Sequence, residues 1–123
     1  MKEPTRLYDY IRDKDYVHIK VIGLNRAKPD SHRYGELVEF LNKNNCKKCL
    51  FDYRKGLFKI DVWTAYNRPR LAKEFDIPRD IKIAAVYQEI TEDITFNETV
   101  FRNQGYRVKA FTDFEKAVDW LTT

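Results

Sequence analysis

The chain has 123 residues and a formal net charge of +4, with 43% hydrophobic and 34% charged residues. Its length suits a single domain over residues 1–123, and its hydrophobic content excludes an intrinsically disordered chain. Acidic residues are scattered among the basic ones, so the charge pattern predicts no nucleic-acid partner. No apolar run approaches the ~20 residues that span a bilayer, and no apolar signal region opens the chain, so we expect a cytoplasmic protein without a membrane span.

The start of the chain predicts an antiparallel hairpin. Residues 7–11 alternate between apolar and polar side chains, and residues 16–22 are rich in β-branched side chains, so both segments are typical of strands. The polar turn over residues 12–15 is short enough to join antiparallel strands. A loop over residues 23–30 follows.

From the second strand onward, strand-like and helix-like segments alternate. The predicted elements are a helix from Asp30 or Ser31 to Asn44-Asn45, a strand over 49–51, a turn over 54–56, a helix over 61–75 interrupted by Pro69, a strand over 81–87, a helix over 92–102 ended by Gly105, a strand over 106–111 and a helix over 114–121 capped by Thr112 or Asp113. Alternation implies parallel strands joined by right-handed crossovers. The predicted fold class is therefore α/β: a single domain with a five-strand mixed sheet, an N-terminal hairpin and four helices.

The C-terminal part carries a recognisable pattern. Residues 96–105 form a helix that ends in Asn-x-Gly, and a strand and a capped helix that closes on Trp120-Leu121 follow. This pattern and the order of the elements resemble the SpoIIAA-like family, within the STAS (sulfate transporter and anti-sigma-factor antagonist) fold, over essentially the whole chain. The resemblance implies a non-enzymatic binding or regulatory module.

In anti-sigma-factor antagonists of this kind, a phosphorylatable Ser or Thr follows an Asp at the start of the second helix. The matching stretch here is Asp61-Val62-Trp63-Thr64. Val62 and Trp63 occupy the hydroxyl positions, no glycine follows them, and Thr64 is displaced. Compared with the family pattern, the chain is therefore expected to lack the phosphorylatable switch.

Cys46 and Cys49 have the spacing of a redox motif, but they follow the predicted end of a helix. A thioredoxin-type motif instead places its first cysteine at a helix N-terminus, where the helix dipole lowers the thiol pKa. Zinc needs about four ligands, and only His18 and His32 could join the pair. We therefore predict no metal and no cofactor, with Cys49 in the core and Cys46 as a semi-exposed thiol.

Asp52 closes the third predicted strand, where a response-regulator receiver carries its phosphoaccepting aspartate. A receiver also needs an acidic pair to hold Mg²⁺, and the corresponding loop, residues 23–26, contains no acid. Asp52 is therefore predicted to be a loop-capping or arginine-pairing carboxylate. His18 alternates with Tyr16 and Lys20, which predicts a place on a solvated strand face rather than a catalytic role.

Basic residues follow two strands that are predicted to open on the same edge of the sheet. Arg26 and Lys28 follow the second strand, whereas Arg54 and Lys55 follow the third. Ligands of open α/β sheets gather at the carboxyl ends of the strands. These four residues, called the basic rim below, are predicted to attract a phosphate, a carboxylate or an acidic protein face. The alternative is an ordinary solvated surface.

A polar segment after the fourth predicted strand carries the acids Glu89, Glu92 and Asp93. They could bind a cation or pair with the basic rim. The preferred interpretation is that Thr91 caps the third helix and that the helix dipole favours acids in its first turn.

The leading hypothesis is a STAS-like module that is not an enzyme and binds a protein partner or a small anionic ligand, with a homodimer left open. The alternative is a small lipid- or hydrophobe-binding protein, because the fold resembles Sec14-type lipid-carrying domains in outline. That alternative needs an apolar pocket. A hydrolase or transferase would need a nucleophile–base pair, and the sequence offers none.

Overall fold

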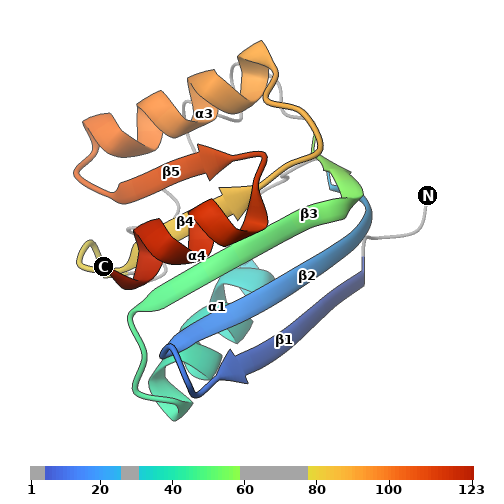
Figure 1. The fold of residues 1–123 in the computed structure, drawn as a ribbon. Helices are drawn as coiled ribbons and strands as arrows, with labels where there is room; N and C mark the ends of the chain where they lie inside the picture. The colour runs from blue at the N-terminus through green and yellow to red at the C-terminus, as the bar shows by residue number, and fades with distance from the viewer. Residues whose placement is uncertain (1–4, 26–30, 59–77) are drawn as a thin grey trace.

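The computed structural model describes residues 5–25, 31–58 and 78–123 (Figure 1). Its elements are β1 (Thr5–Ile11), β2 (Tyr16–Asn25), α1 (Ser31–Lys43), β3 (Lys48–Phe58), β4 (Lys82–Val86), α3 (Glu92–Asn103), β5 (Arg107–Phe111) and α4 (Phe114–Thr122). The strands form one sheet in the order β1-β2-β3-β4-β5, with β1 antiparallel to β2 and all other pairs parallel. This confirms the predicted α/β class, mixed sheet and N-terminal hairpin. The helix predicted over 61–75 lies outside the described residues.

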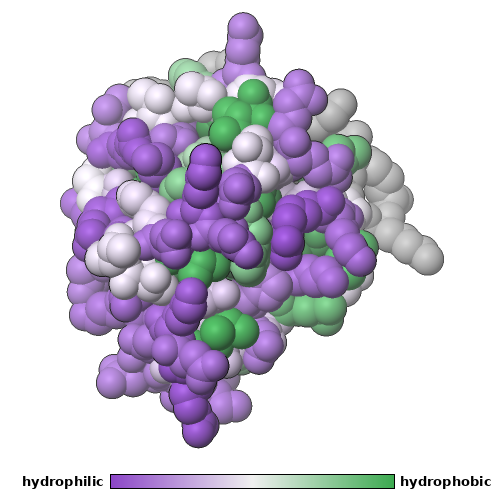
Figure 2. Space-filling view, viewed as in Figure 1, coloured by the Kyte–Doolittle hydropathy of each residue, from purple (hydrophilic) through white to green (hydrophobic). Residues whose placement is uncertain are grey.

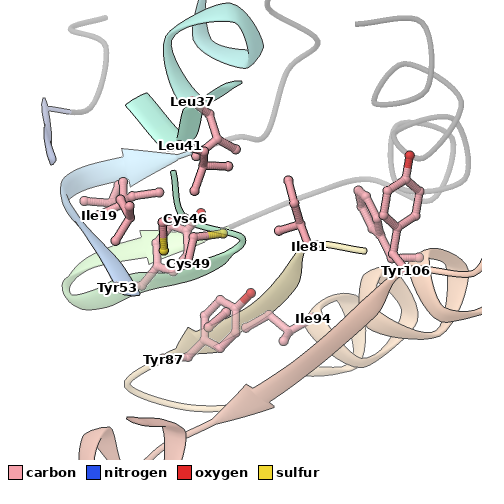
Figure 3. Packing of buried hydrophobic residues seen from close by; sticks show 14 residues of the cluster. Ile19, Leu37, Leu41, Cys46, Cys49, Tyr53, Ile81, Tyr87, Ile94 and Tyr106 are labelled. Carbon is pink, nitrogen blue, oxygen red and sulfur yellow. The ribbon is translucent and has the colours of Figure 1, made fainter. Parts of the chain in front are cut away.

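Helices pack on both faces of the sheet, with α4 in front and α1 behind in the view of Figure 1. Strand alternation divides the core between the two faces, because successive side chains point in opposite directions. Val17, Ile19 and Val21 of β2 belong to a buried cluster to which α1 and α3 also contribute, and Figure 3 shows this cluster. Tyr16 of β2 and Leu50 of β3 pack with α4 on the other face. None of the described helices is both long enough and apolar enough to cross a membrane.

Side-chain contacts hold both ends of α4 in place. The Asp113 side chain accepts a hydrogen bond from the backbone N–H of Lys116 at 3.1 Å, which confirms the predicted N-cap. At the other end the buried Lys82 donates to the backbone carbonyl of Trp120, and its ammonium lies 4.5 Å from the centre of the Trp120 ring. A cation at a helix C-terminus is favoured by the helix dipole. Between these ends, α4 buries the side chains of Ala117, Val118 and Leu121.

The central strands are longer than predicted. The strand expected over 49–51 runs from Lys48 to Phe58, so the turn predicted over 54–56 is wrong, and β2 continues to Asn25. A register shift lies between Lys20 and Ile22, beyond which Gly23 pairs with Gly56. The side-chain amide of Gln88 donates to the Gly56 carbonyl at 3.0 Å. It thereby satisfies part of the β3 backbone that extends past β4.

Gly56 is needed for this extension because two backbones meet there. A Cβ atom at Gly56 would lie 2.8 Å from the carbonyl oxygens of both Gly23 and Val21. We expect Gly56→Ala to lower the free energy of unfolding by about 1–3 kcal/mol, measured by urea denaturation. The control is Gly35→Ala in α1, where nothing lies within 4 Å and alanine favours the helix. Equal stability of the Gly56→Ala variant and the wild-type protein would contradict the prediction.

Candidate functional site

A buried carboxylate, Asp52, lies at the centre of a cluster of polar side chains on β2 and β3. Its Oδ1 accepts from the Arg54 backbone N–H at 3.0 Å and from Arg54 Nε at 2.9 Å. Its Oδ2 accepts from Arg54 Nη2 at 2.8 Å and from His18 Nε2 at 2.9 Å. Burial by itself would raise the pKa of Asp52, but the hydrogen bonds from Arg54 and His18 outweigh it and lower this pKa to about 2. Because Asp52 is ionised, His18 Nε2 carries the proton of this bond.

Parallel pairing of β2 and β3 explains why these residues meet. Lys20 lies opposite Asp52 and His18 lies opposite Leu50, so all four share one face of the sheet. His18 is therefore a diagonal neighbour of Asp52. Arg54 lies two residues after Asp52 and so shares its face of the sheet, and the Arg54 side chain bonds to the Asp52 carboxylate. A register shift beyond Lys20 gives β3 one extra residue between Asp52 and Lys55.

The first residue of α4 completes the cluster. The guanidinium carbon of Arg54 lies 4.2 Å from the centre of the Phe114 ring, and the His18 ring meets the same ring edge-on at 5.8 Å. The Arg54 side chain is held on one side by a carboxylate and on the other by an aromatic face. It is nevertheless 49% exposed. Figure 2 shows that the face carrying α4 is largely hydrophilic, with hydrophobic side chains in small separate patches.

This geometry favours binding over catalysis. Four donors already occupy the Asp52 oxygens, so the carboxylate is poorly placed to act as a base or to accept a phosphoryl group. Arg54, by contrast, uses two of its five N–H donors on Asp52. Among the described residues, no group accepts a hydrogen bond from the three others. Within the described ranges, His, Cys, Asp and Glu side chains form no group of three that could hold a metal ion.

The structure describes only part of the basic rim. Arg54 and Lys55 lie inside β3 and not in a loop after it, so their predicted setting is wrong, although both remain close to the carboxyl end of that strand. Asp52 pairs with an arginine, which is one of its two predicted roles. Arg26 and Lys28 fall outside the described residues, and so do the four positions that match the phosphorylated turn: Asp61, Val62, Trp63 and Thr64.

His18 is the site residue that sequence reasoning missed. It was expected on a solvated strand face, but its side chain is only 21% exposed and is bonded to Asp52. The β-branched run over residues 16–22 gave no sign of this contact, because the partner lies 34 residues away in sequence. One usable signal was present: two charged residues of opposite sign at alternate positions, Asp52 and Arg54, directly after the apolar run over residues 49–51.

Both cysteines are free thiols inside the core. Cys49 is fully buried, as predicted, but Cys46 is also buried at 4% exposure, so its predicted semi-exposed position is wrong. Asn45 takes a left-handed conformation after α1 (φ 49°), and the Cys46 thiol donates to the Lys48 carbonyl at 3.3 Å. Burial raises the pKa of both thiols, which disfavours the reactive thiolate.

Two of the three acids after β4 lie at the start of α3, and Glu89 precedes the helix. Thr91 occupies the N-cap position as predicted, but its side chain makes no capping hydrogen bond. Its hydroxyl donates instead to the Asp93 carboxylate, which accepts the backbone N–H of Ile94 at 3.1 Å. Glu92 and Asp93 lie in the first turn, where the helix dipole favours them.

Comparison with known proteins finds similar folds among solved structures only. No family model and no curated protein matches the chain. Among solved structures, it is similar to an uncharacterised protein of the DUF3478 family with a SpoIIAA-like fold from Shewanella loihica PV-4, with 18% identity, a TM-score of 0.57, and coverage of 98% of this chain and 95% of the other. It also matches the anti-sigma factor antagonist SpoIIAA in its unphosphorylated form, with 12% identity, a TM-score of 0.48, and coverage of 94% and 95%. The first likeness shows a SpoIIAA-like fold, which agrees with the fold implied by the sequence resemblance.

Proposed function

We propose that this SpoIIAA-like domain is a non-enzymatic binding module that recognises a phosphate or carboxylate group on a small ligand or a protein partner. The observation that carries the proposal is the fixed, half-exposed guanidinium of Arg54 above Phe114. Lys55 follows it on β3 and supplies a second positive charge. Arg26 and Lys28 are included in the proposed site because they follow the end of β2, which pairs with β3 as far as Asn25 and Phe58.

Preorganisation is what makes Arg54 suitable for this role. A free arginine loses side-chain entropy when it grips an anion, whereas Arg54 is already ordered by Asp52 and Phe114. Its remaining donors can form paired, charge-assisted hydrogen bonds with a phosphate or carboxylate. The attraction added by Lys55 weakens with salt, because the Debye length is ~8 Å at physiological ionic strength. The alternative of a hydrophobic-ligand carrier needs an apolar cavity, and no observation on the described residues favours one.

Anion binding is best tested by a nuclear magnetic resonance titration with inorganic phosphate. We expect the Arg54 Nε–H resonance to shift with phosphate, and Arg54→Lys to weaken binding about tenfold because a bidentate contact is lost. The matched control is Arg102→Lys. Arg102 is 51% exposed and also pairs with a carboxylate, that of Glu98, but it lies away from Asp52. Equal phosphate affinity of the two variants would contradict the assignment of the site.

A second experiment separates a small ligand from a protein partner. The wild-type protein and the double variant Arg26→Ala/Arg54→Ala are used as bait in native cytosol, and both retained proteins and co-purified small molecules are identified. The proposal predicts that the double variant, folded as judged by its melting curve, loses an anionic ligand or an acidic partner. If it keeps every partner and ligand, the basic rim is only a solvated surface.

A further inference from the structure

The two edges of the sheet are protected very differently. At the β5 edge, Glu98 Oε2 accepts from the Ala110 backbone N–H at 2.9 Å, and Arg102 Nε donates to the Val108 carbonyl at 2.9 Å. Glu98 and Arg102 also pair with each other at 3.3 Å. Side chains of α3 therefore occupy backbone groups of β5 to which another strand would bond. A covered edge of this kind resists strand addition.

Among the residues that the structure describes, no side chain covers the backbone of the β1 edge in this way. All seven residues of β1 pair with β2 in unbroken register, and β1 is the last strand of the sheet on that side. It contains no proline, no lysine and no bulge, which are among the devices that make an edge strand unsuitable for pairing, and its charged residues are Arg6 and Asp9, one of each sign. Tyrosine and β-branched side chains also favour a strand that pairs on both sides.

Charges at the two ends of β1 are complementary. At the N-terminal end, the Nε atom of Arg6 is buried, and no described group accepts a hydrogen bond from it. At the C-terminal end, the Tyr10 hydroxyl donates to the Asp15 carboxylate at 2.7 Å. Arg6 and Tyr10 lie on the same face of the sheet, because side chains alternate along a strand.

We infer that β1 pairs antiparallel with β1 of a second copy of this chain, so that one sheet continues through both copies. Pairing centred on Tyr8 engages all seven residues and places Arg6 opposite Tyr10 of the second copy, within reach of the Asp15 carboxylate there. Two-fold symmetry repeats this contact, so each Arg6 gains an acidic partner. An interface built mainly on one strand is small, and the dimer is therefore concentration-dependent.

Sedimentation velocity on the full chain from micromolar to millimolar concentration tests the dimer. We expect a monomer–dimer equilibrium that Arg6→Glu weakens about tenfold or more by reversing the charge opposite Asp15. The matched control is Arg107→Glu, the same charge reversal on the β5 edge, which leaves dimerisation unchanged. A wild-type chain that stays monomeric throughout, or equal effects of the two substitutions, would overturn the inference.

Cross-linking locates the interface even if Arg6→Glu fails to fold. Leu7 is 52% exposed and adjoins the proposed axis, so two cysteines at this position would lie about 7–8 Å apart as diagonal neighbours. We expect a short bis-maleimide to join Leu7→Cys chains and to leave Phe96→Cys chains, exposed on α3, largely unjoined. The native thiols are buried and should not compete. Equal cross-linking of the two variants would exclude β1 as the interface.

Discussion

Removal of the chain from Asp113 onward is expected to abolish cooperative unfolding. The deletion takes away α4 and uncovers Leu50, Ala84 and Val86, which are fully buried beneath it. Each large side chain that loses its apolar environment costs about 1.5–3 kcal/mol, and a small domain has only about 5–15 kcal/mol in total. The truncated chain should therefore show no sigmoidal urea transition and should bind a hydrophobic dye.

A single substitution tests the packing of α4 without removing the helix. Leu121→Ala leaves a cavity at a site with no exposed surface and should cost about 2–5 kcal/mol. The matched control is Leu57→Ala, where the side chain is 53% exposed and the expected change is within about 0.5 kcal/mol. A truncated chain that melts like the full one, or equal losses in the two leucine variants, would contradict this account of α4.

Strongly patterned elements were predictable from the sequence, and the length of β3 was not. The hairpin, β4 and α4 each combine a clear periodicity with a turn or cap. Gly105 follows the end of α3, as predicted, and has a positive φ of 92°. From the sequence, Gly56 predicts a turn, because glycine is a strong turn signal. In the structure it is a point of close contact with Val21 and Gly23, so its tertiary neighbours decide its role.

The candidate site was predictable only in part, because most of its contacts join residues that are distant in sequence. An arginine two residues after Asp52 was visible as a pairing partner along the chain. His18 joins through the parallel pairing of β2 with β3, and local periodicity does not encode which strands become neighbours. The place of Phe114 beside Arg54 depends on α4 returning to the same face of the sheet. Contacts between distant segments therefore built most of the cluster.

The buried carboxylate of Asp52 should make the free energy of unfolding depend on pH. Replacement of one of its oxygens by an amide nitrogen should lower that free energy. Asp52→Asn retains one acceptor oxygen but places an amide N–H₂ group where a carboxylate oxygen met Arg54 and His18. The amide N–H groups then face the N–H groups of Arg54 and His18, and no hydrogen bond forms between them. Loss of the charge removes about 2 kcal/mol of stability near neutral pH, since the pKa of Asp52 falls from 3.8 to about 2 on folding and each pKa unit is worth about 1.4 kcal/mol.

The sign of the pH dependence follows from that lowered pKa. A carboxyl group with a depressed folded-state pKa stabilises the fold fully above its unfolded pKa, and this contribution disappears as pH falls through the folded value. Urea denaturation of the wild-type protein and Asp52→Asn should therefore show their largest difference near neutral pH and convergence between about pH 4 and about pH 2. The control is Asp80→Asn, whose carboxylate pairs with Lys47 at 2.5 Å on the exposed surface and should give little difference at any pH. A gap between wild type and Asp52→Asn that stays constant with pH would mean that Asp52 is not held ionised by Arg54 and His18.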